Sequence, residues 1–166
     1  MIKNSSRKKR ELRRPEYHSE PVLHAWKDCR KLERLDSVRL ENETIEDCTA
    51  DTFSECELKH VVFRGRYRGI LFADAVFEHC DFSNAELDES QFRRCIFRNC
   101  RMMGTTFIRS TLVDVILDRC VATYANFNRS SWKVAEWNDS SFEEAGFGGC
   151  TFQEIKLKEC NFTDCD

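Results

Sequence analysis

A period of five residues organises most of this sequence and constrains its fold more than any other feature. Every fifth residue from Phe72 to Phe162 gives nineteen positions, of which eighteen carry a large apolar side chain and one carries Ala122. The residue two places before each of these is small or β-branched, as at Cys80 and Ala85. A strict period of five fits neither an α-helix nor a flat β-strand, whose periods are 3.6 and 2 residues. The chain must therefore turn once every five residues, directing one large and one small side chain inward each time.

Four such turns close a square coil, and successive coils pair through backbone hydrogen bonds at about the 4.8 Å spacing of neighbouring strands. Residues twenty apart then lie above one another. The sequence contains such columns, one of small residues (Cys80, Cys100, Cys120, Ser140, Cys160) and one of large residues (Phe72, Phe92, Leu112, Trp132, Phe152). We therefore predict an all-β fold, a quadrilateral β-helix of about five to six coils around a continuous apolar core.

The pattern has one irregular position, and its spacing slips before residue 70. Ala122 is the single small residue in the large-residue series, and we expect either a narrower coil there or a Tyr124 side chain turned inward. Phe63 and Phe72 are nine residues apart instead of ten, so one residue is missing between them. We interpret the intervening segment as a short loop or kink. The β-helix is assigned to residues 46–166, regular from residue 70 and without a C-terminal cap.

The N-terminal part of the chain has a different composition. Residues 21–45 are expected to form an N-terminal cap made of a strand at Ser37–Leu40 and a short helix, whose apolar face would carry Val22, Trp26, Cys29 and Leu32. Residues 1–20 contain seven Lys or Arg and three Glu, which predicts a disordered, solvated tail. The alternative is an arm that contacts nucleic acid or an acidic partner.

The cysteines and the overall charge exclude several classes of protein. Seven of the ten cysteines, from Cys80 to Cys165, are separated by multiples of five, and no CxxC pair occurs. We expect free thiols that pack as small residues in a reducing compartment, with no metal and no other cofactor. The apolar runs are too short to span a membrane, and no apolar segment follows the basic N-terminus. A soluble, cytoplasmic protein is expected.

No set of residues suited to nucleophilic catalysis can be assembled from the sequence. His79 is the single histidine inside the regular repeat and occupies an outward position, whereas most Ser and Thr occupy inward small positions. Gly146, Gly148 and Gly149 lie at turns of the repeat and not in a loop that precedes a helix and binds phosphate. We predict a binding protein and not an enzyme.

The repeat unit resembles a known family. Residues 125–129 (Ala-Asn-Phe-Asn-Arg) and 80–84 (Cys-Asp-Phe-Ser-Asn) are similar to the consensus of the pentapeptide-repeat family, which implies a right-handed quadrilateral β-helix. Residues 97–104 and Tyr124 go beyond that consensus, since Met103, Gly104 and Tyr124 are not required by the repeat. Here the sequence is most similar to the Qnr-like quinolone-resistance proteins of Gram-positive bacteria. This resemblance implies a DNA mimic that binds DNA gyrase or topoisomerase IV, protects it from fluoroquinolones, does not bind DNA itself, and forms a homodimer through its C-terminal end.

Three groups of residues are candidates for the contact surface. The first is an acidic surface made of Glu136, Asp139, Glu143, Glu144, Glu154, Glu159 and Asp164. The second is a loop made of Arg64, Gly65, Arg66, Tyr67 and Arg68. The third is an apolar contact made of Met103, Ile108 and Val113, which supports the alternative of a scaffold module that binds an unrelated protein through its outer faces. Salt separates these alternatives, because charge mimicry weakens with ionic strength and apolar docking does not.

Overall fold

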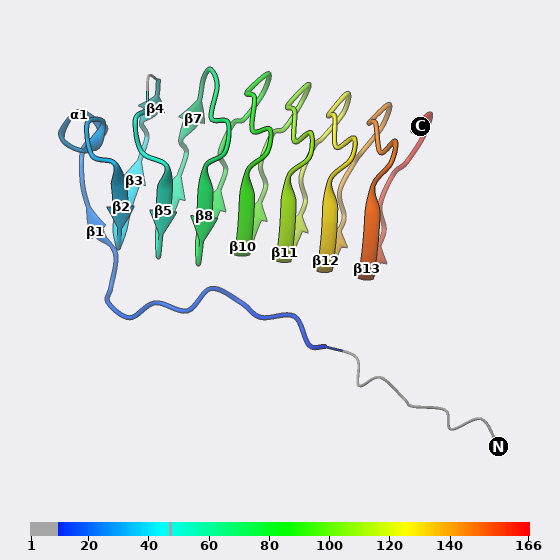
Figure 1. Cartoon of the computed structure of the whole chain (residues 1–166), viewed down its shortest axis with the longest axis horizontal. Coiled ribbons are helices and arrows are strands. Elements are labelled where there is room, and N and C mark those ends of the chain that lie inside the picture. The colour runs from blue at the N-terminus through cyan, green and yellow to red at the C-terminus, as the bar shows by residue number, and fades with distance from the viewer. Residues whose placement is uncertain (1–9, 47) are drawn as a thin grey trace.

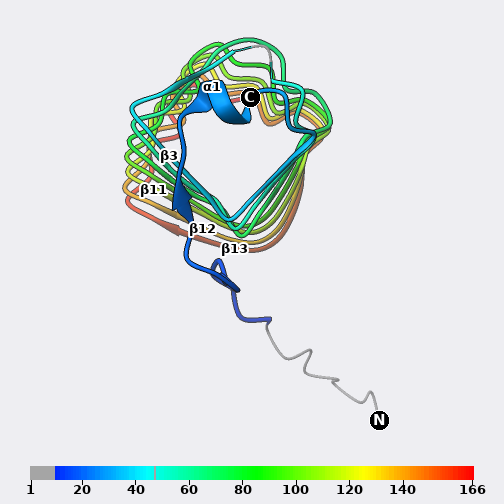
Figure 2. The same cartoon turned by 90° about the vertical axis from the view of Figure 1, so that its left-hand side faces the viewer.

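The chain forms a parallel β-solenoid of about seven turns, shown from the side in Figure 1 and from one end in Figure 2 as a computed structural model. The structure describes residues 10–46 and 48–166. Before the solenoid lie β1 (Val22–Leu23) and α1 (Trp26–Cys29). The first two coils contain β2 (Arg34–Asp36), β3 (Val38–Glu41), β4 (Thr44–Ile45), β5 (Thr52–Ser54), β6 (Glu57–Lys59) and β7 (Val62–Phe63). The later coils contain β8 (Leu71–Ala73), β9 (Val76–Glu78), β10 (Gln91–Arg98), β11 (Thr111–Asp118), β12 (Ser131–Asn138) and β13 (Thr151–Lys158).

The predicted stacking of residues twenty apart is confirmed in the regular part of the solenoid. Phe92 of β10 pairs with Leu112 of β11, and Leu112 pairs with Trp132 of β12, in parallel register. Earlier coils are shorter, because Leu35 pairs with Phe53 and Phe53 pairs with Phe72, spacings of 18 and 19 residues. The solenoid therefore begins at β2 and has more coils than the five to six expected. The sequence pattern did not reveal the first coils, because their periods of 18 and 19 residues differ from the period of 20 in the later coils.

Each coil turns at its corners through single residues with a left-handed backbone. One corner column consists of Ser37, Glu55, Asp74, Arg94, Asp114, Val134 and Glu154, whose φ angles lie between 52° and 59°. The next corner repeats this at Asn42, His60, His79, Asn99, Arg119, Asp139 and Glu159. Positive φ is uncommon outside glycine, and here it recurs in register because the stacked coils impose it. The five-residue period thus consists of one turning residue and four that cross a face.

The core is built from stacked aromatic rings and from small residues that donate hydrogen bonds. Phe72 and Phe92 stack with ring centroids 5.3 Å apart. The Cys95 thiol lies 3.5 Å from the Phe72 carbonyl oxygen, and the Ser110 hydroxyl donates to the Leu87 carbonyl at 2.8 Å. Each donor reaches back 23 residues, to the preceding coil. Burial raises the pKa of Cys95 to about 12, so this thiol stays protonated. All ten cysteines are free in the structure.

Two sequence irregularities have structural explanations. The missing residue lies between Phe63 and Tyr67, because Phe63 aligns with Phe82 whereas Tyr67 aligns with Leu87. Tyr67 is 5% exposed and takes the place of a large core residue, so this segment completes a coil.

Ala122 is fully buried, but the Tyr124 side chain is 56% exposed and does not fill the space beside it. The same coil contains Trp132 and Trp137, whose rings lie 4.7 Å apart in the core. We attribute the tolerance of Ala122 to these two large indoles, which supply volume that the alanine lacks.

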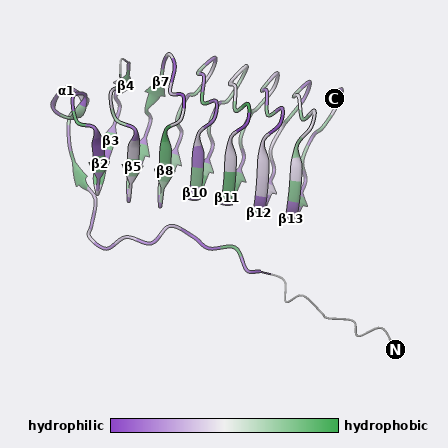
Figure 3. Ribbon diagram, in the orientation of Figure 1, coloured by the Kyte–Doolittle hydropathy of each residue, from purple (hydrophilic) through white to green (hydrophobic). Residues whose placement is uncertain are grey.

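The N-terminal part of the chain forms an arm along the outside of the solenoid and then a cap on its first coil. In α1, Trp26 and Cys29 are buried against the first coil as expected, whereas Val22 and Leu32 are exposed and lie outside the helix. Residues 10–21, which we call the N-terminal arm, run along the outside of the coils towards β13 (Figure 1), where a disordered tail was expected; residues 1–9 lie outside the described part. The arm is mainly hydrophilic (Figure 3). In the described ranges, no helix has the length and apolar character needed to cross a membrane.

Candidate partner-binding surface

Five of the seven candidate acids gather around one side of the solenoid. We call the side made by residues 80–84, 100–104, 120–124, 140–144 and 160–164 face three. Glu143 lies on this face, and Glu144 and Asp164 share the left-handed corner column that ends it. Asp139 and Glu159 share the corner column that precedes it. All five side chains are exposed.

The other two candidate acids lie elsewhere and already have partners. Glu136 accepts a hydrogen bond from the Lys156 ammonium at 2.7 Å on the preceding side of the solenoid. Glu154 belongs to a third corner column and accepts the backbone N–H of Arg10 at 2.8 Å. The seven acids therefore do not form one line, although they are close in the sequence.

Face three also carries the residues that the repeat does not require. Met103 is 49% exposed and Tyr124 is 56% exposed, and the backbone N–H of Gly104 donates to the Thr123 carbonyl, which places these residues on adjacent coils. A hydrogen bond to Glu144 raises the pKa of the Tyr124 hydroxyl. Apolar and acidic side chains therefore share this face.

Gly104 has a structural reason to be glycine. Its φ is +63°, and a Cβ atom there would lie 2.7 Å from the Asn84 side-chain oxygen. A larger residue would be strained and would displace Asn84.

The predicted apolar contact is not a single patch. Met103 lies on face three, Ile108 is half-buried on the next side, and Val113 is half-buried on β11, where it pairs with Arg93 and Lys133. The three residues follow the coil around the solenoid. Of these three residues, Met103 alone lies near another exposed apolar side chain in the described part of the chain. This neighbour is Val121 on the adjacent coil, which is 42% exposed.

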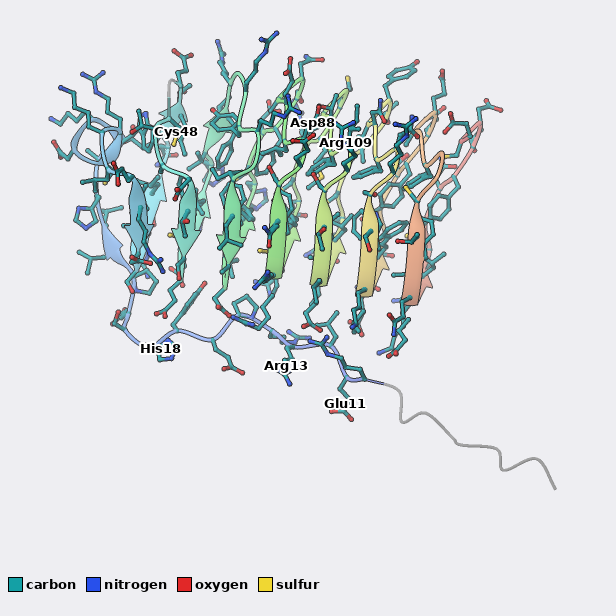
Figure 4. The ribbon with its side chains drawn as sticks, in the orientation of Figure 1. Glu11, Arg13, His18, Cys48, Asp88 and Arg109 are labelled. Atoms are coloured by element: carbon teal, nitrogen blue, oxygen red, sulfur yellow. The ribbon has the colours of Figure 1, made fainter. Side chains whose placement is uncertain are left out.

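The predicted loop is a basic strip without a projecting backbone. Arg66 lies 3.1 Å from Glu86, and Arg68 and Arg109 lie 2.8 and 2.5 Å from Glu89. Hydrogen bonds from these two guanidinium groups lower the pKa of Glu89 to about 2. Arg109 and Asp88 lie on the opposite side of the solenoid from the arm residues Arg13 and His18 (Figure 4).

Over residues 10–46 and 48–166, no three His, Cys, Asp or Glu side chains are grouped so that they could hold a metal ion. His60 and His79 stack at 5.0 Å on the outer corner column, with no bonded serine or cysteine among the described contacts.

The sequence reasoning missed the contacts of the arm with the solenoid. Carboxylates of Glu55, Asp74, Asp114 and Glu154 accept hydrogen bonds from arm residues, and all four belong to one corner column. A signal was present, because Ile96 and Ile116 are outward positions that carry large apolar residues twenty apart. Such a pair predicts that something covers the outside of the coils there.

Comparisons with known proteins give consistent similarities. Residues 70–140 match the family described as "Pentapeptide repeat region". The chain is 33% identical over 69 residues to the quinolone resistance pentapeptide repeat protein QnrB96 of Scandinavium goeteborgense; the match covers 41% of this chain and 32% of that protein, about a third of its length.

Two solved structures were also found to be similar. A trypsin-treated variant of QnrB1, a plasmid-mediated fluoroquinolone resistance protein, is 16% identical with a TM-score of 0.37, covering 80% of this chain and 73% of the other. The pentapeptide repeat protein Rfr23 from the cyanobacterium Cyanothece 51142 is 12% identical with a TM-score of 0.28, covering 78% and 87%.

Proposed function

Residues 70–140 place this chain in the pentapeptide-repeat family, and from that premise we propose that it is a non-enzymatic, cytoplasmic DNA mimic that binds DNA gyrase or topoisomerase IV and protects it from fluoroquinolones. The observation that carries the proposal is the 33% identity over 69 residues to a quinolone resistance protein. We take face three as the surface that meets the topoisomerase.

The spacing of charge on face three supports this assignment. Asp139 and Glu159 repeat on one corner column, and Glu144 and Asp164 repeat on the next. Over the last two coils, two acids per coil spacing of about 4.8 Å give one charge per about 2.4 Å of the axis, whereas the coil before them carries Arg119 on the first of these columns. Duplex DNA carries one charge per about 1.7 Å of its axis, a similar density. A basic groove that binds DNA would therefore attract the C-terminal coils of this face.

DNA supercoiling by gyrase in the presence of ciprofloxacin tests the proposal. The wild-type protein should restore supercoiling, and the variant E143K/E144K/E159K should need at least about tenfold more protein, because close charge pairs contribute 1.4 kcal/mol or more. The control E33K/E41K/E46K makes the same change in charge at the other end of the solenoid and should protect normally. Equal protection by the two variants would exclude charge mimicry by face three.

A second candidate function is a scaffold that binds an unrelated protein through an apolar area. It is favoured by the exposure of Met103, Val121 and Tyr124, which are 49%, 42% and 56% exposed on adjacent coils. Such binding should be insensitive to salt and should be lost in M103A/Y124A. Topoisomerase binding that weakens steeply with salt would instead favour the DNA mimic.

We also propose, from the resemblance, that two copies join through their C-terminal ends. Phe147, Phe152, Leu157 and Phe162 line an apolar hollow of about 430 Å³ on the C-terminal side of the solenoid. Phe152 and Leu157 are 49% and 56% exposed. Light scattering over a range of concentrations should give the mass of a dimer, and L157D should give a monomer. A monomeric wild-type protein at all concentrations would contradict this proposal.

A further inference from the structure

The N-terminal arm is held by a regular series of backbone hydrogen bonds. It runs from the β13 coil back towards β1, along one corner of the solenoid (Figures 1 and 4). Four arm N–H groups donate to carboxylates of the corner column: Arg10 to Glu154 at 2.8 Å, Arg13 to Asp114 at 3.3 Å, Glu16 to Asp74 at 3.0 Å and His18 to Glu55 at 2.7 Å. The donors belong to the peptide backbone, so this recognition does not depend on the side chains of the arm.

The spacing of these acceptors matches the repeat of an extended peptide. Glu154, Asp114 and Asp74 lie on alternate coils, and two coils rise by about 9.6 Å. The donors that they bind are three residues apart, and an extended chain with the three-residue repeat of polyproline II spans about 9.3 Å in three residues, with every third N–H on the same side. An extended chain therefore stays in register with alternate coils, and the corner column acts as a template for it.

Charged side chains add a preference for a basic peptide. The Arg10 guanidinium lies 2.6 Å from Asp114, whose side chain is 2% exposed. Both carboxylate oxygens of Asp114 are bonded by the arm, one by this guanidinium and the other by the Arg13 N–H. A carboxylate so deeply buried requires such partners. The imidazole Nδ1 of His18 lies 2.5 Å from one carboxylate oxygen of Glu55, while the His18 N–H donates to the other oxygen.

The floor beneath the arm is apolar. Ile96, Ile116 and Val134 are only 4%, 6% and 4% exposed, yet they lie outside the cluster of core residues. Val134 lines a hollow together with the arm residue Leu12, and Ile96 and Ile116 line another with Arg14. The corner column and this floor form a groove with an apolar base and a mainly acidic edge, in which Arg94 bonds both carboxylate oxygens of Asp74.

We propose that this groove is a binding site for an extended basic peptide, and that residues 10–19 fill it until a basic segment of the partner replaces them. Replacement by a partner rests on the proposed function, because a surface that binds DNA is rich in Lys and Arg. The binding of an extended basic peptide in the groove does not depend on the proposed function. Replacement is feasible because the His18 side chain is 87% exposed, so that its ion pair is weak, and because a basic segment of the partner would give the buried Asp114 a cation in place of Arg10.

A labelled peptide tests the groove in the intact 166-residue chain. The variant R10E/R13E places acids opposite Asp114 and Glu154 and should release the arm while leaving the groove intact. We expect fluorescein-labelled peptide 1–19 to bind this variant at least about tenfold more tightly than wild type, in which the arm competes. Adding Asp114→Asn should reverse the gain, because asparagine tolerates the left-handed corner but lacks the charge. The control Asp139→Asn makes the same change on a corner column away from the arm and should leave binding unchanged.

A second set of peptides tests the backbone contacts directly. Peptides N-methylated at Arg13 and Glu16 keep their charge but lose two of the donors, and should bind at least about tenfold more weakly. Methylation at Arg14, whose N–H has no bond among the described contacts, should have little effect. Equal binding by wild type and R10E/R13E, or equal effects of the two methylation patterns, would overturn the proposed groove.

Replacement by the partner is tested by the gyrase supercoiling assay. The released variant R10E/R13E should protect gyrase at a lower concentration than wild type. Equal protection by both would overturn the replacement step and leave the groove intact. Peptide binding without protection by either protein would instead show that the proposed function is wrong, so the two failures are distinguishable.

Discussion

Val134 combines a strained backbone with a position under the arm, and this combination gives a quantitative prediction. It is the β-branched member of the corner column that the arm follows, with φ of 57°. A left-handed backbone costs an ordinary L-residue about 1–2 kcal/mol, whereas asparagine adopts it readily. Val134 is nonetheless 4% exposed, beside Leu12. We infer that its burial under the arm offsets the strain.

The substitution Val134→Asn should therefore have opposite effects in two backgrounds. In the released variant R10E/R13E, the burial is already lost, and relief of the strain should raise the free energy of unfolding by about 1 kcal/mol. In the wild-type background the same relief is offset by the loss of about 1.5 kcal/mol of valine burial, so stability should fall by about 0.5 kcal/mol. The difference between backgrounds, about 1.5 kcal/mol, is the coupling energy between Val134 and the arm.

Urea unfolding followed by tryptophan fluorescence measures these values, since Trp132 and Trp137 are buried in the same coil. Arg129→Asn serves as the control, because Arg129 is an exposed left-handed corner residue on a column that the arm does not contact. Its effect should be the same in both backgrounds. If Val134→Asn also gave equal effects within about 0.5 kcal/mol, the arm would not cover Val134. A loss of stability in both backgrounds would refute the argument from strain.

Three further predictions concern the core and the arm. Ser110→Ala should lower the free energy of unfolding by about 1–3 kcal/mol in urea titrations, because it leaves the buried Leu87 carbonyl of the preceding coil without its donor. Ser110→Cys should recover part of this free energy, since a cysteine at the equivalent position 150 bonds a carbonyl in the same way. Ala122→Leu should destabilise by about 1–3 kcal/mol through overpacking, and combining it with Trp137→Phe should restore the thermal midpoint if that indole fills the space. The hydrogen bond to Glu55 raises the pKa of His18 above 6.5, so the contact is complete below that value and is lost as pH rises through the raised pKa. The protection factors of the arm amides, which correct for the faster intrinsic exchange at higher pH, should fall over this range and should not fall in His18→Asn.

The sequence predicted the solenoid because its packing is local and repeated. Each coil places a large and a small residue inward at fixed spacing, as at Ser90 and Phe92, whatever the outward residues are. The corner columns were less visible, because residues as different as Asp114, Val134 and Tyr124 all adopt positive φ there. Stacking fixes their backbone and propensity does not, so no residue type marks the corners.

The arm was harder to predict than the solenoid for a different reason. A basic segment with Pro15 has the composition of a solvated tail, and its contacts join residues as distant as Arg10 and Glu154, 144 positions apart. Three of the four acceptors, Asp74, Asp114 and Glu154, stand forty residues apart, so the regular repeat already places them on one corner. The missing information was where the arm lies, because the arm is outside the repeat and has no register of its own in the sequence.

Coil geometry also changes how the charge of this chain should be counted. Residues 136–166 hold eight acids and two lysines, which suggested one acidic surface at that end of the chain. In a solenoid, however, neighbours in space are about twenty residues apart, so Glu154 lies beside Val134 and Asp114 and binds the arm. Charge reversal at Glu154 would release the arm and leave the acids of face three unchanged. A test of DNA mimicry that included Glu154 would therefore perturb two surfaces at once, and only substitutions confined to face three report on the mimic.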